Sequence, residues 1–286
     1  MVVAINHLRK NRIKYLLNFL VTLILVISAI PIVSFADSII DKGRYIFQLA
    51  NCYACHTDVE NDGLPLAGGR AMETQFGTFY PPNITVDKET GIGHWTEKQF
   101  AQAVRKGLSP DGSHYYPTFP YSAYKNISDS DIKALKAYIF SLKPLKQKNK
   151  SHDLKWYISR LTLPVWKTLN TDQSSDKLNT DRGAYLVDTL GHCNECHTPR
   201  NSIGLLQMDL KFSGNEDLAA PDISSDSLKD WNKEELIDLF SDGALPDGDY
   251  VSDHMAEVVE FSTSKWKPDD LKAVIRYLRT AKKNVK

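Results

Sequence analysis

Cys52-Tyr53-Ala54-Cys55-His56 is the stretch that decides the fold of this chain, and Cys193-Asn194-Glu195-Cys196-His197 is its second copy. Both read Cys-x-x-Cys-His, the pattern by which a c-type haem is attached. The two thiols add to the vinyl groups of a haem, and the adjacent imidazole binds the iron. The sequence therefore predicts two covalently bound haems c, with His56 and His197 as iron ligands.

Two other uses of a Cys-x-x-Cys pair fit these stretches less well. A redox-active pair does not require the histidine that follows both copies. A zinc site needs its two halves close in sequence, whereas the copies begin at Cys52 and Cys193. All four cysteines of the chain lie in the two motifs, so none is left for a disulfide.

Length and charge agree with a protein of two domains. The chain has 286 residues, and 42% of them are hydrophobic. Its 35 basic and 35 acidic residues give a formal net charge of zero, so no nucleic-acid partner is expected.

Residues 1–36 have the composition of a targeting segment. Basic residues between 9 and 14 precede an apolar run over 16–30, and Ser34-Phe35-Ala36 offers the small residues of a signal-peptidase site. Cleavage after Ala36 is favoured. The alternative is an uncut membrane anchor, because 15–35 is long enough to span a bilayer. Both alternatives place the rest of the chain in the periplasm, either soluble or attached to the inner membrane.

The remaining chain is an internal repeat. Matching landmarks occur in the same order and, from the tryptophan onward, at the same offsets: Gly43-Arg44-Tyr45, Trp95, Gly107 and Pro110-Asp111-Gly112 against Gly183-Ala184-Tyr185, Trp231, Gly243 and Pro246-Asp247-Gly248. We therefore predict a first haem domain over 37–143, called here the first repeat. The second haem domain, called the second repeat, is predicted over 181–286.

An all-α fold is expected, with a few helices and long loops around each haem. Apolar residues at helical spacing predict helices over 43–50, 97–106, 131–142, 182–190, 233–241 and 269–280. Thr96, Ser128 and Asn232 are suitable N-caps. Residues 144–180 are expected to form a strap that joins the repeats. Because it carries Trp156 and Trp166, we expect it to pack across both domains with its lysines in solvent.

Several further stretches resemble the multihaem cytochrome c subunits of membrane-bound bacterial alcohol, gluconate and sugar dehydrogenases, and their free-standing dihaem relatives. The resemblance covers about 42–280. It is most specific at 76–80, Pro82-Asn83-Ile84-Thr85, Gly91-Ile92-Gly93-His94-Trp95, Tyr116-Pro117, Pro120-Tyr121, 191–193 and Thr198-Pro199-Arg200-Asn201. It implies two tandem cytochrome c domains. It also implies electron carriage from a periplasmic or membrane dehydrogenase to the respiratory chain, through an oxidase or another cytochrome.

An electron-transfer haem normally has a sixth ligand, often methionine. Met255 lies eight residues after Asp247, on what is expected to be the loop before the last helix, and it is the predicted ligand of the second iron. The alternative is a methionine that only fills a gap in the core.

The same offset in the first repeat lands on Phe119, eight residues after Asp111. The resembling dehydrogenase subunits commonly have methionine there, and phenylalanine cannot bind iron. His114 is the candidate sixth ligand of the first haem. Met72 and an open or water-bound iron are the alternatives, and His114 could also be an ordinary surface histidine.

Arg70 and Asn83 are candidates for holding haem propionates, through charge-assisted and amide hydrogen bonds. Ordinary loop structure explains them equally well, and Trp95 is interpreted as core. His94, His152, His192 and His254 receive no role.

Two function classes remain. The leading hypothesis is a dihaem electron carrier, which needs no catalytic side chain because the cofactor carries the chemistry. The alternative is a dihaem enzyme, peroxidase-like or another small-molecule redox catalyst, that uses a first iron with a weak or absent sixth ligand. It draws on Phe119 alone, whereas the carrier hypothesis draws on the whole framework.

Overall fold

The computed structural model describes residues 31–170 and 181–281, with side chains from Asp37 onward. The expected targeting segment therefore lies outside the described residues, except for the helical backbone of 31–36. Residues 171–180 of the strap also lie outside them. Within the described ranges, none of the helices combines the length and the apolarity needed to cross a bilayer.

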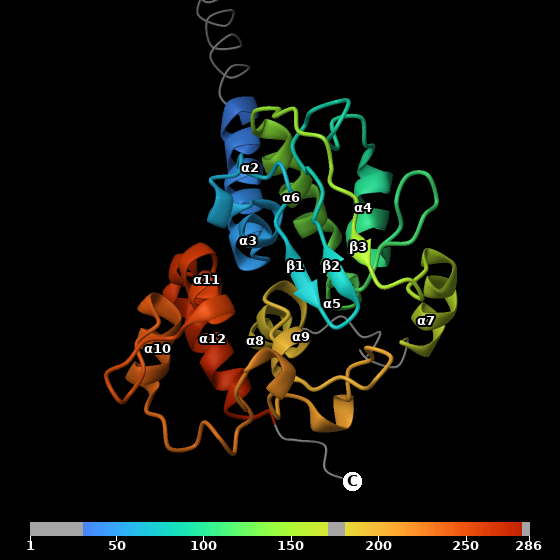
Figure 1. Cartoon of the computed structure of the whole chain (residues 1–286). Helices are drawn as coiled ribbons and strands as arrows, with labels where there is room; N and C mark the ends of the chain where they lie inside the picture. The colour runs from blue at the N-terminus through green and yellow to red at the C-terminus, as the bar shows by residue number, and fades with distance from the viewer. Residues whose placement is uncertain (1–30, 171–180, 282–286) are drawn as a thin grey trace, which may run out of the picture.

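The first repeat forms the upper half of the molecule in Figure 1. Its helices are α2 (Pro31–Leu49), α3 (Cys52–His56), α4 (Glu97–Lys106), α5 (Tyr121–Tyr124) and α6 (Asp129–Ser141). The predicted helices over 97–106 and 131–142 are confirmed. The first helix starts much earlier than the sequence suggests, at Pro31 and not at Gly43.

The second repeat forms the lower half. It consists of α8 (Arg182–Ala184), the π-helix η4 (Tyr185–Leu190), α9 (Asn194–His197), α10 (Lys233–Asp242), α11 (Asp253–Phe261) and α12 (Pro268–Leu278). The three predicted helices are present. The expectation of a loop around Met255 is wrong, because this residue lies in the first turn of α11.

Short elements complete the fold. Three strands, β1 (Met72–Thr74), β2 (Gly77–Phe79) and β3 (Asp153–Leu154), make an antiparallel sheet in the order β1-β2-β3, with Met72 opposite Phe79 and Gly77 opposite Leu154. Single 3-10 turns lie at Val59–Asn61, Arg160–Thr162, Met208–Leu210, Glu216–Leu218 and Thr263–Lys265. The predicted helical fold is confirmed, and this small sheet is an addition to it.

Local sequence explains where the two middle helices begin and end. Thr96 and Asn232 each accept a hydrogen bond from the backbone three residues on, and the side chains of Gln99 and Glu235 bond back to the cap. Such reciprocal caps satisfy backbone donors that the first helical turn leaves open. Gly107 and Gly243 end α4 and α10 in the left-handed conformation.

In each repeat the first helix crosses the last helix at a glycine. A Cβ on Gly43 would stand 1.9 Å from the carbonyl oxygen of Ala134, and one on Gly183 would stand 2.2 Å from that of Ala273. Only glycine allows backbones to approach so closely. The two crossings occupy equivalent positions in the repeats. The first helix of each repeat therefore packs against the last helix in the same way.

The strap, 144–180, differs from the expectation. Its first part lies along the first repeat, where Asn149 accepts a hydrogen bond from the backbone of Asn83 and β3 joins the sheet. Trp166, on α7 (Leu163–Leu169), donates to the carbonyl of Ile203 in the second repeat. Trp156, however, is 94% exposed, so the prediction that both tryptophans pack is wrong for it.

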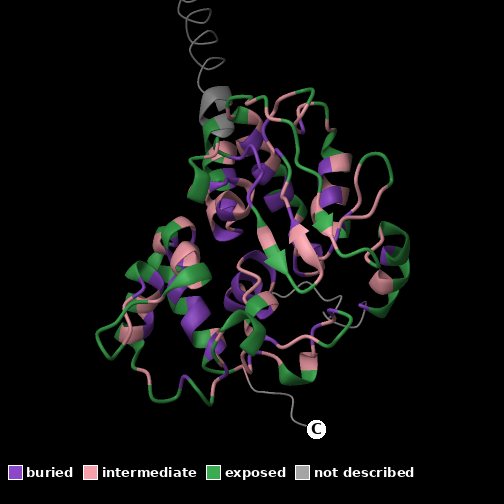
Figure 2. Cartoon of the chain, viewed as in Figure 1, coloured by how far each residue is buried: buried purple, intermediate pink, exposed green. Residues whose placement is uncertain are grey.

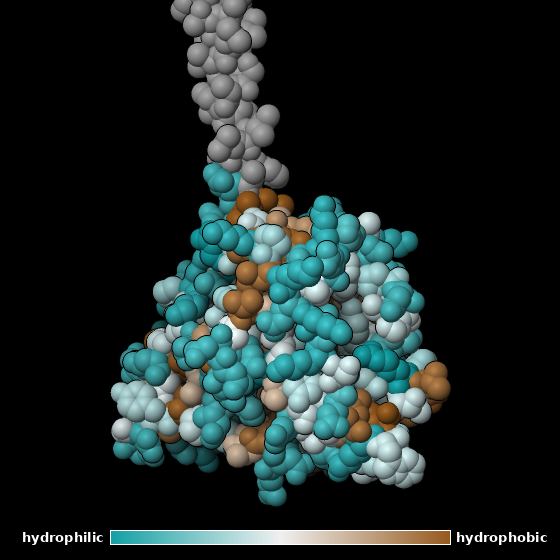
Figure 3. Space-filling model, turned by 45° about the horizontal axis from the view of Figure 1, so that its top comes forward, coloured by the Kyte–Doolittle hydropathy of each residue, from teal (hydrophilic) through white to brown (hydrophobic). Residues whose placement is uncertain are grey.

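One hydrophobic core runs through both repeats. Phe47 and Leu49 on α2, Leu186 on η4 and Val274 on α12 belong to the same cluster of buried side chains. Figure 2 shows buried residues on the facing sides of the two halves. Figure 3 shows a mostly hydrophilic surface in which hydrophobic side chains form small separate groups. The repeats therefore pack against each other through apolar surface.

Candidate haem-binding sites

The two Cys-x-x-Cys-His motifs have the same local structure. Asn51 and His192, the residues before the first cysteines, have positive φ angles of 49° and 40°. This turn leads from the preceding helix into the short helices α3 and α9. Thr57 and Thr198, which follow the histidines, are buried, and their hydroxyls accept backbone N–H bonds of 3.0 Å from Leu66 and Phe212. The local sequence thus gives both motifs the same backbone turn and the same threonine hydrogen bond.

Each motif histidine is held by a proline carbonyl. Nδ1 of His56 lies 2.8 Å from the carbonyl oxygen of Pro82, and Nδ1 of His197 lies 2.8 Å from that of Pro221. In the tautomer where Nδ1–H donates this bond, Nε2 keeps its lone pair for a metal. Burial lowers the pKa of both imidazoles, which favours the neutral form that iron needs.

The four cysteines form no disulfide with one another, and burial raises the pKa of each thiol before haem attachment. For Cys52 and Cys193 the pKa rises to about 12. The residues fit a covalent haem in both motifs, because each offers two unpaired thiols and an imidazole oriented through Nδ1. A haem bound there would supply a one-electron redox centre.

A second contact to the motif backbone recurs in both repeats. Arg70 donates to the carbonyl of Ala54 at 2.7 Å, and Arg200 donates to the carbonyl of Glu195 at 3.4 Å and pairs with its carboxylate. Ala54 and Glu195 are the equivalent third residues of the two motifs. Burial raises the pKa of Glu195, although Arg200 opposes this. Sequence reasoning missed the role of Arg200, whose signal was its place three residues after His197.

The motifs approach each other around Tyr124. The hydroxyl of Tyr124 donates to the carbonyl of Ala50 at 2.9 Å, and its ring centroid lies 5.5 Å from that of His192. Burial raises the pKa of Tyr124 well above its usual value, and Cys52, Cys55 and Glu195 lie close enough to contribute, so Tyr124 lies near both motifs. This arrangement brings two haem sites together across the contact between the repeats.

The candidate sixth ligands lie in different surroundings. Met255 is half-buried and packs against the main core from α11. Phe119 packs edge-on against Tyr115 and Tyr124, with ring centroids 6.1 and 5.7 Å apart. Met72 belongs instead to a small cluster around Phe79 beside the sheet. None of these contacts tests iron ligation, so the ligand assignments stay predictions.

His114 pairs with Leu108 in an isolated bridge of the loop before Phe119. Its Nδ1 is buried and has no hydrogen-bond partner within the described part of the chain, while its carbonyl accepts a bond of 2.6 Å from Arg160. Burial and the nearby Lys167 lower the pKa of its imidazole. A neutral imidazole whose Nδ1 has no partner among the described residues is compatible with the predicted ligand role.

The two candidate propionate contacts have protein partners. Arg70 bonds to Glu257 on α11 in addition to Ala54. Asn83 is fully buried, and its amide nitrogen donates to the Thr90 hydroxyl at 3.1 Å and to the Leu145 carbonyl at 2.7 Å. The amide of Asn83 is thus occupied in fixing its loop and the strap, and a propionate contact there stays a prediction.

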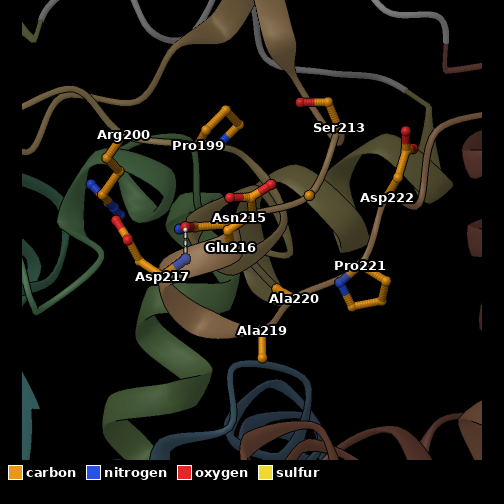
Figure 4. A pocket seen from close by; sticks show the side chains of 11 residues that line it. Pro199, Arg200, Ser213, Asn215, Glu216, Asp217, Ala219, Ala220, Pro221 and Asp222 are labelled. Carbon is orange, nitrogen blue, oxygen red and sulfur yellow. Dashed lines mark hydrogen bonds between the residues drawn. The ribbon is translucent and has the colours of Figure 1, made fainter.

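A pocket lies between the residues that follow the second motif and the loop of 213–222 (Figure 4). It is lined by Pro199, Arg200, Ser213, Gly214, Asn215, Glu216, Asp217, Ala219, Ala220, Pro221 and Asp222. Arg200 and Asp222 stand on opposite sides of it. Because Pro221 accepts the bond from His197, this loop forms the support of the second imidazole.

Comparison with known proteins agrees with this geometry. The family model for cytochrome c matches residues 40–143. A dihaem cytochrome c of Cereibacter sphaeroides is 38% identical over 251 residues, which cover 83% of this chain and 84% of that protein. The cytochrome c subunit of the quinone alcohol dehydrogenase of Gluconobacter oxydans is 36% identical over 265 residues, 85% of this chain and 55% of the subunit.

The gluconate 2-dehydrogenase cytochrome c subunit of Pantoea cypripedii is 35% identical over 268 residues, which cover 85% of this chain and 60% of the subunit. The chain thus spans a little more than half the length of the dehydrogenase subunits, and most of the length of the dihaem protein. With two attachment motifs of one geometry, it is a member of the cytochrome c family that carries two covalent haems c and transfers electrons.

Proposed function

We propose that this chain is a periplasmic dihaem carrier that accepts electrons from a dehydrogenase and passes them to the respiratory chain, through an oxidase or another cytochrome. The observation that carries the proposal is the pair of motif histidines, each bonded through Nδ1 to a proline carbonyl at 2.8 Å. The donor class rests on the similarity to alcohol and gluconate dehydrogenase subunits. Attachment to the inner membrane would come from the N-terminal segment.

For the irons, we propose His56 and His197 as proximal ligands and Met255 as the sixth ligand of the second haem. His114 is proposed for the first haem. Met72 or water is the alternative there, because Phe119 occupies the position equivalent to Met255. A haem with two protein ligands suits electron transfer, since neither redox state has to exchange a ligand.

A dihaem enzyme is the second candidate, and Phe119 is the observation that favours it. An iron without a strong sixth ligand could bind peroxide or another small molecule. The reduced dihaem protein separates the two functions. A carrier should bind carbon monoxide slowly and turn over no peroxide. Rapid stoichiometric binding at one haem, together with peroxide turnover, would favour the enzyme.

The donor and the location need separate measurements. A candidate quinone-type dehydrogenase with its substrate should reduce both haems, and terminal oxidase in membranes should reoxidise them. Cell fractionation should place the dihaem protein in the periplasm or on the inner membrane. A mature N-terminus at Asp37 would support a cleaved product, and an intact Met1 would support an anchor. Failure of every tested dehydrogenase to reduce the protein would contradict the donor class.

A further inference from the structure

Two contacts between the repeats use the same pair of residue types. The Tyr45 hydroxyl, on the first helix of the first repeat, donates to Oδ2 of Asp270 at 2.7 Å. Asp270 lies in the first turn of α12, the last helix of the second repeat. The backbone N–H of Lys267, the residue before α12, donates to the same hydroxyl at 2.9 Å. We call this group the Tyr45 lock.

The other contact runs in the opposite direction. The Tyr185 hydroxyl, at the start of η4 in the second repeat, donates to Oδ2 of Asp131 at 2.7 Å. Asp131 lies in the first turn of α6, the last helix of the first repeat. The backbone N–H of Ser128, the N-cap of α6, donates to the Tyr185 hydroxyl at 3.2 Å. We call this group the Tyr185 lock.

The two locks are equivalent position by position. Each tyrosine ends a four-residue pattern of a basic residue, glycine, any residue and tyrosine, over Lys42–Tyr45 and Arg182–Tyr185. The basic residue binds the aspartate of its own repeat: Lys42 lies 2.7 Å from Asp131, and Arg182 reaches Asp270 at 2.6 and 2.8 Å. In each repeat the basic residue therefore orients the aspartate carboxylate, and that carboxylate accepts a hydrogen bond from the tyrosine of the other repeat.

Both carboxylates are buried and ionised. Burial by itself would raise their pKa values, but hydrogen bonds outweigh it. Lys42 and Tyr185 hold the pKa of Asp131 below its usual range, and Arg182 and Tyr45 do the same for Asp270. Hydrogen bonds to buried charged groups are stronger than neutral ones, so each lock is a firm and directional contact.

Each tyrosine also lies on the segment that leads into a haem motif. The helix bearing Tyr45 ends at Leu49, three residues before Cys52, and η4 begins at Tyr185 and ends at Leu190, three residues before Cys193. A lock that fixes the tyrosine thus fixes the start of the motif. We propose that Tyr45 and Tyr185 are positioning residues for electron transfer between the two haems, holding the motifs at one distance and orientation. The inference rests on the electron-carrier function proposed above.

The test replaces each hydroxyl without changing the ring, in the full dihaem chain. Tyr45→Phe, Tyr185→Phe and the double variant are compared with Tyr157→Phe, an exposed tyrosine of the strap. Pulse reduction gives the interhaem electron-transfer rate. Soret circular dichroism gives an exciton couplet that depends on the distance and orientation of the haems. Because the pulse supplies the electrons, the result is independent of the proposed dehydrogenase donor.

Loss of one bond to a charged group should shift the docked-to-undocked ratio about tenfold, and loss of both about a hundredfold. Because the two bonds also orient the helices within the docked state, the double variant should show a weaker couplet and slower interhaem transfer than either single variant, while Tyr157→Phe behaves like the parent. Within one lock the effects should not add, so Tyr45→Phe should change little in an Asp270→Asn background. Tyr185→Phe should keep its full effect there.

An unchanged couplet and an unchanged interhaem rate in the double variant would overturn the inference, even if its thermal stability fell. So would an equal loss in Tyr157→Phe. If the double variant does not accumulate with two haems, the single variants in the Asp270→Asn background decide by the same criterion. Full additivity of Tyr45→Phe and Asp270→Asn would then reject the Tyr45 lock.

Discussion

Replacing Glu257 with glutamine should loosen the contact between α11 and the first haem motif. Glu257 accepts hydrogen bonds from Arg70 at 2.7 and 2.8 Å, and Arg70 also donates to the carbonyl of Ala54 inside the motif. The rings of Tyr53 and Phe261 pack nearby, with centroids 5.1 Å apart. The ion pair therefore joins the helix of the predicted sixth ligand to the other haem's attachment site.

The burial of the two side chains decides the size of the effect. The side chains of Arg70 and Glu257 are 10% and 22% exposed, so the pair is largely removed from solvent. Breaking a fully buried pair costs about 3–5 kcal/mol, because a charge is left without its partner. Arg70 keeps its bond to Ala54 in this variant, and some water reaches the site. We therefore expect a loss of about 2 kcal/mol, which corresponds to a fall in Tm of about 4–8 °C.

Thermal unfolding of the dihaem protein, followed by Soret absorbance, measures this loss. Glu260→Gln, an exposed position one turn further along α11, is the matched control. Removing a negative charge beside the first motif should also favour reduced iron, so the potential of the first haem should rise in Glu257→Gln. If the two variants unfold at the same temperature and leave the first potential unchanged, the ion pair does not connect the sites as described.

Four further outcomes are expected. Cys193→Ala together with Cys196→Ala should leave one covalent haem, which mass spectrometry of the chain can count. Met255→Ala should remove the weak far-red band of methionine-bound ferric haem and lower the second potential, with both haems still attached. His114→Ala should keep that band while the reduced protein binds carbon monoxide faster. Stability should fall as the pH drops below about 4, because the unfolded carboxyl of Asp270 takes up a proton before the folded one, whose pKa is lowered. Asp270→Asn should flatten this dependence in acid unfolding curves.

Short-range patterns let the sequence predict much of this molecule. The two motifs, the caps at Thr96 and Asn232 and the ends at Gly107 and Gly243 depend on neighbours within a few residues. Their physical causes are local hydrogen bonds and permitted backbone angles, which are visible in residue order. The equivalent caps and helix ends therefore occur in the structure at the positions that the internal repeat of the sequence predicts.

Local sequence patterns do not predict the contacts between segments that are distant in the sequence. Nothing near Tyr45 indicates that its hydroxyl meets Asp270, and the pairing of β3 with β2 joins segments more than 70 residues apart. The exposure of Trp156 depends on how the strap lies over the first repeat. Such features follow from the packing of whole elements, and tertiary context overrides the expectation that tryptophans are buried.

The π-helix η4 shows how the two repeats keep equivalent contacts despite unequal length. From the glycine crossing to the first cysteine the first repeat advances nine positions (52 − 43) and the second advances ten (193 − 183). In η4 the N–H of Gly191 bonds to the carbonyl five residues back, at Leu186, and such a turn takes in one residue more than an α-helical turn. Because Gly183 must cross α12 and Cys193 must begin the motif, a continuous α-helix would rotate one of them out of place. The π-helical turn therefore accommodates the extra residue between Gly183 and Cys193. It does so after Tyr185, which binds Asp131, and before the second motif.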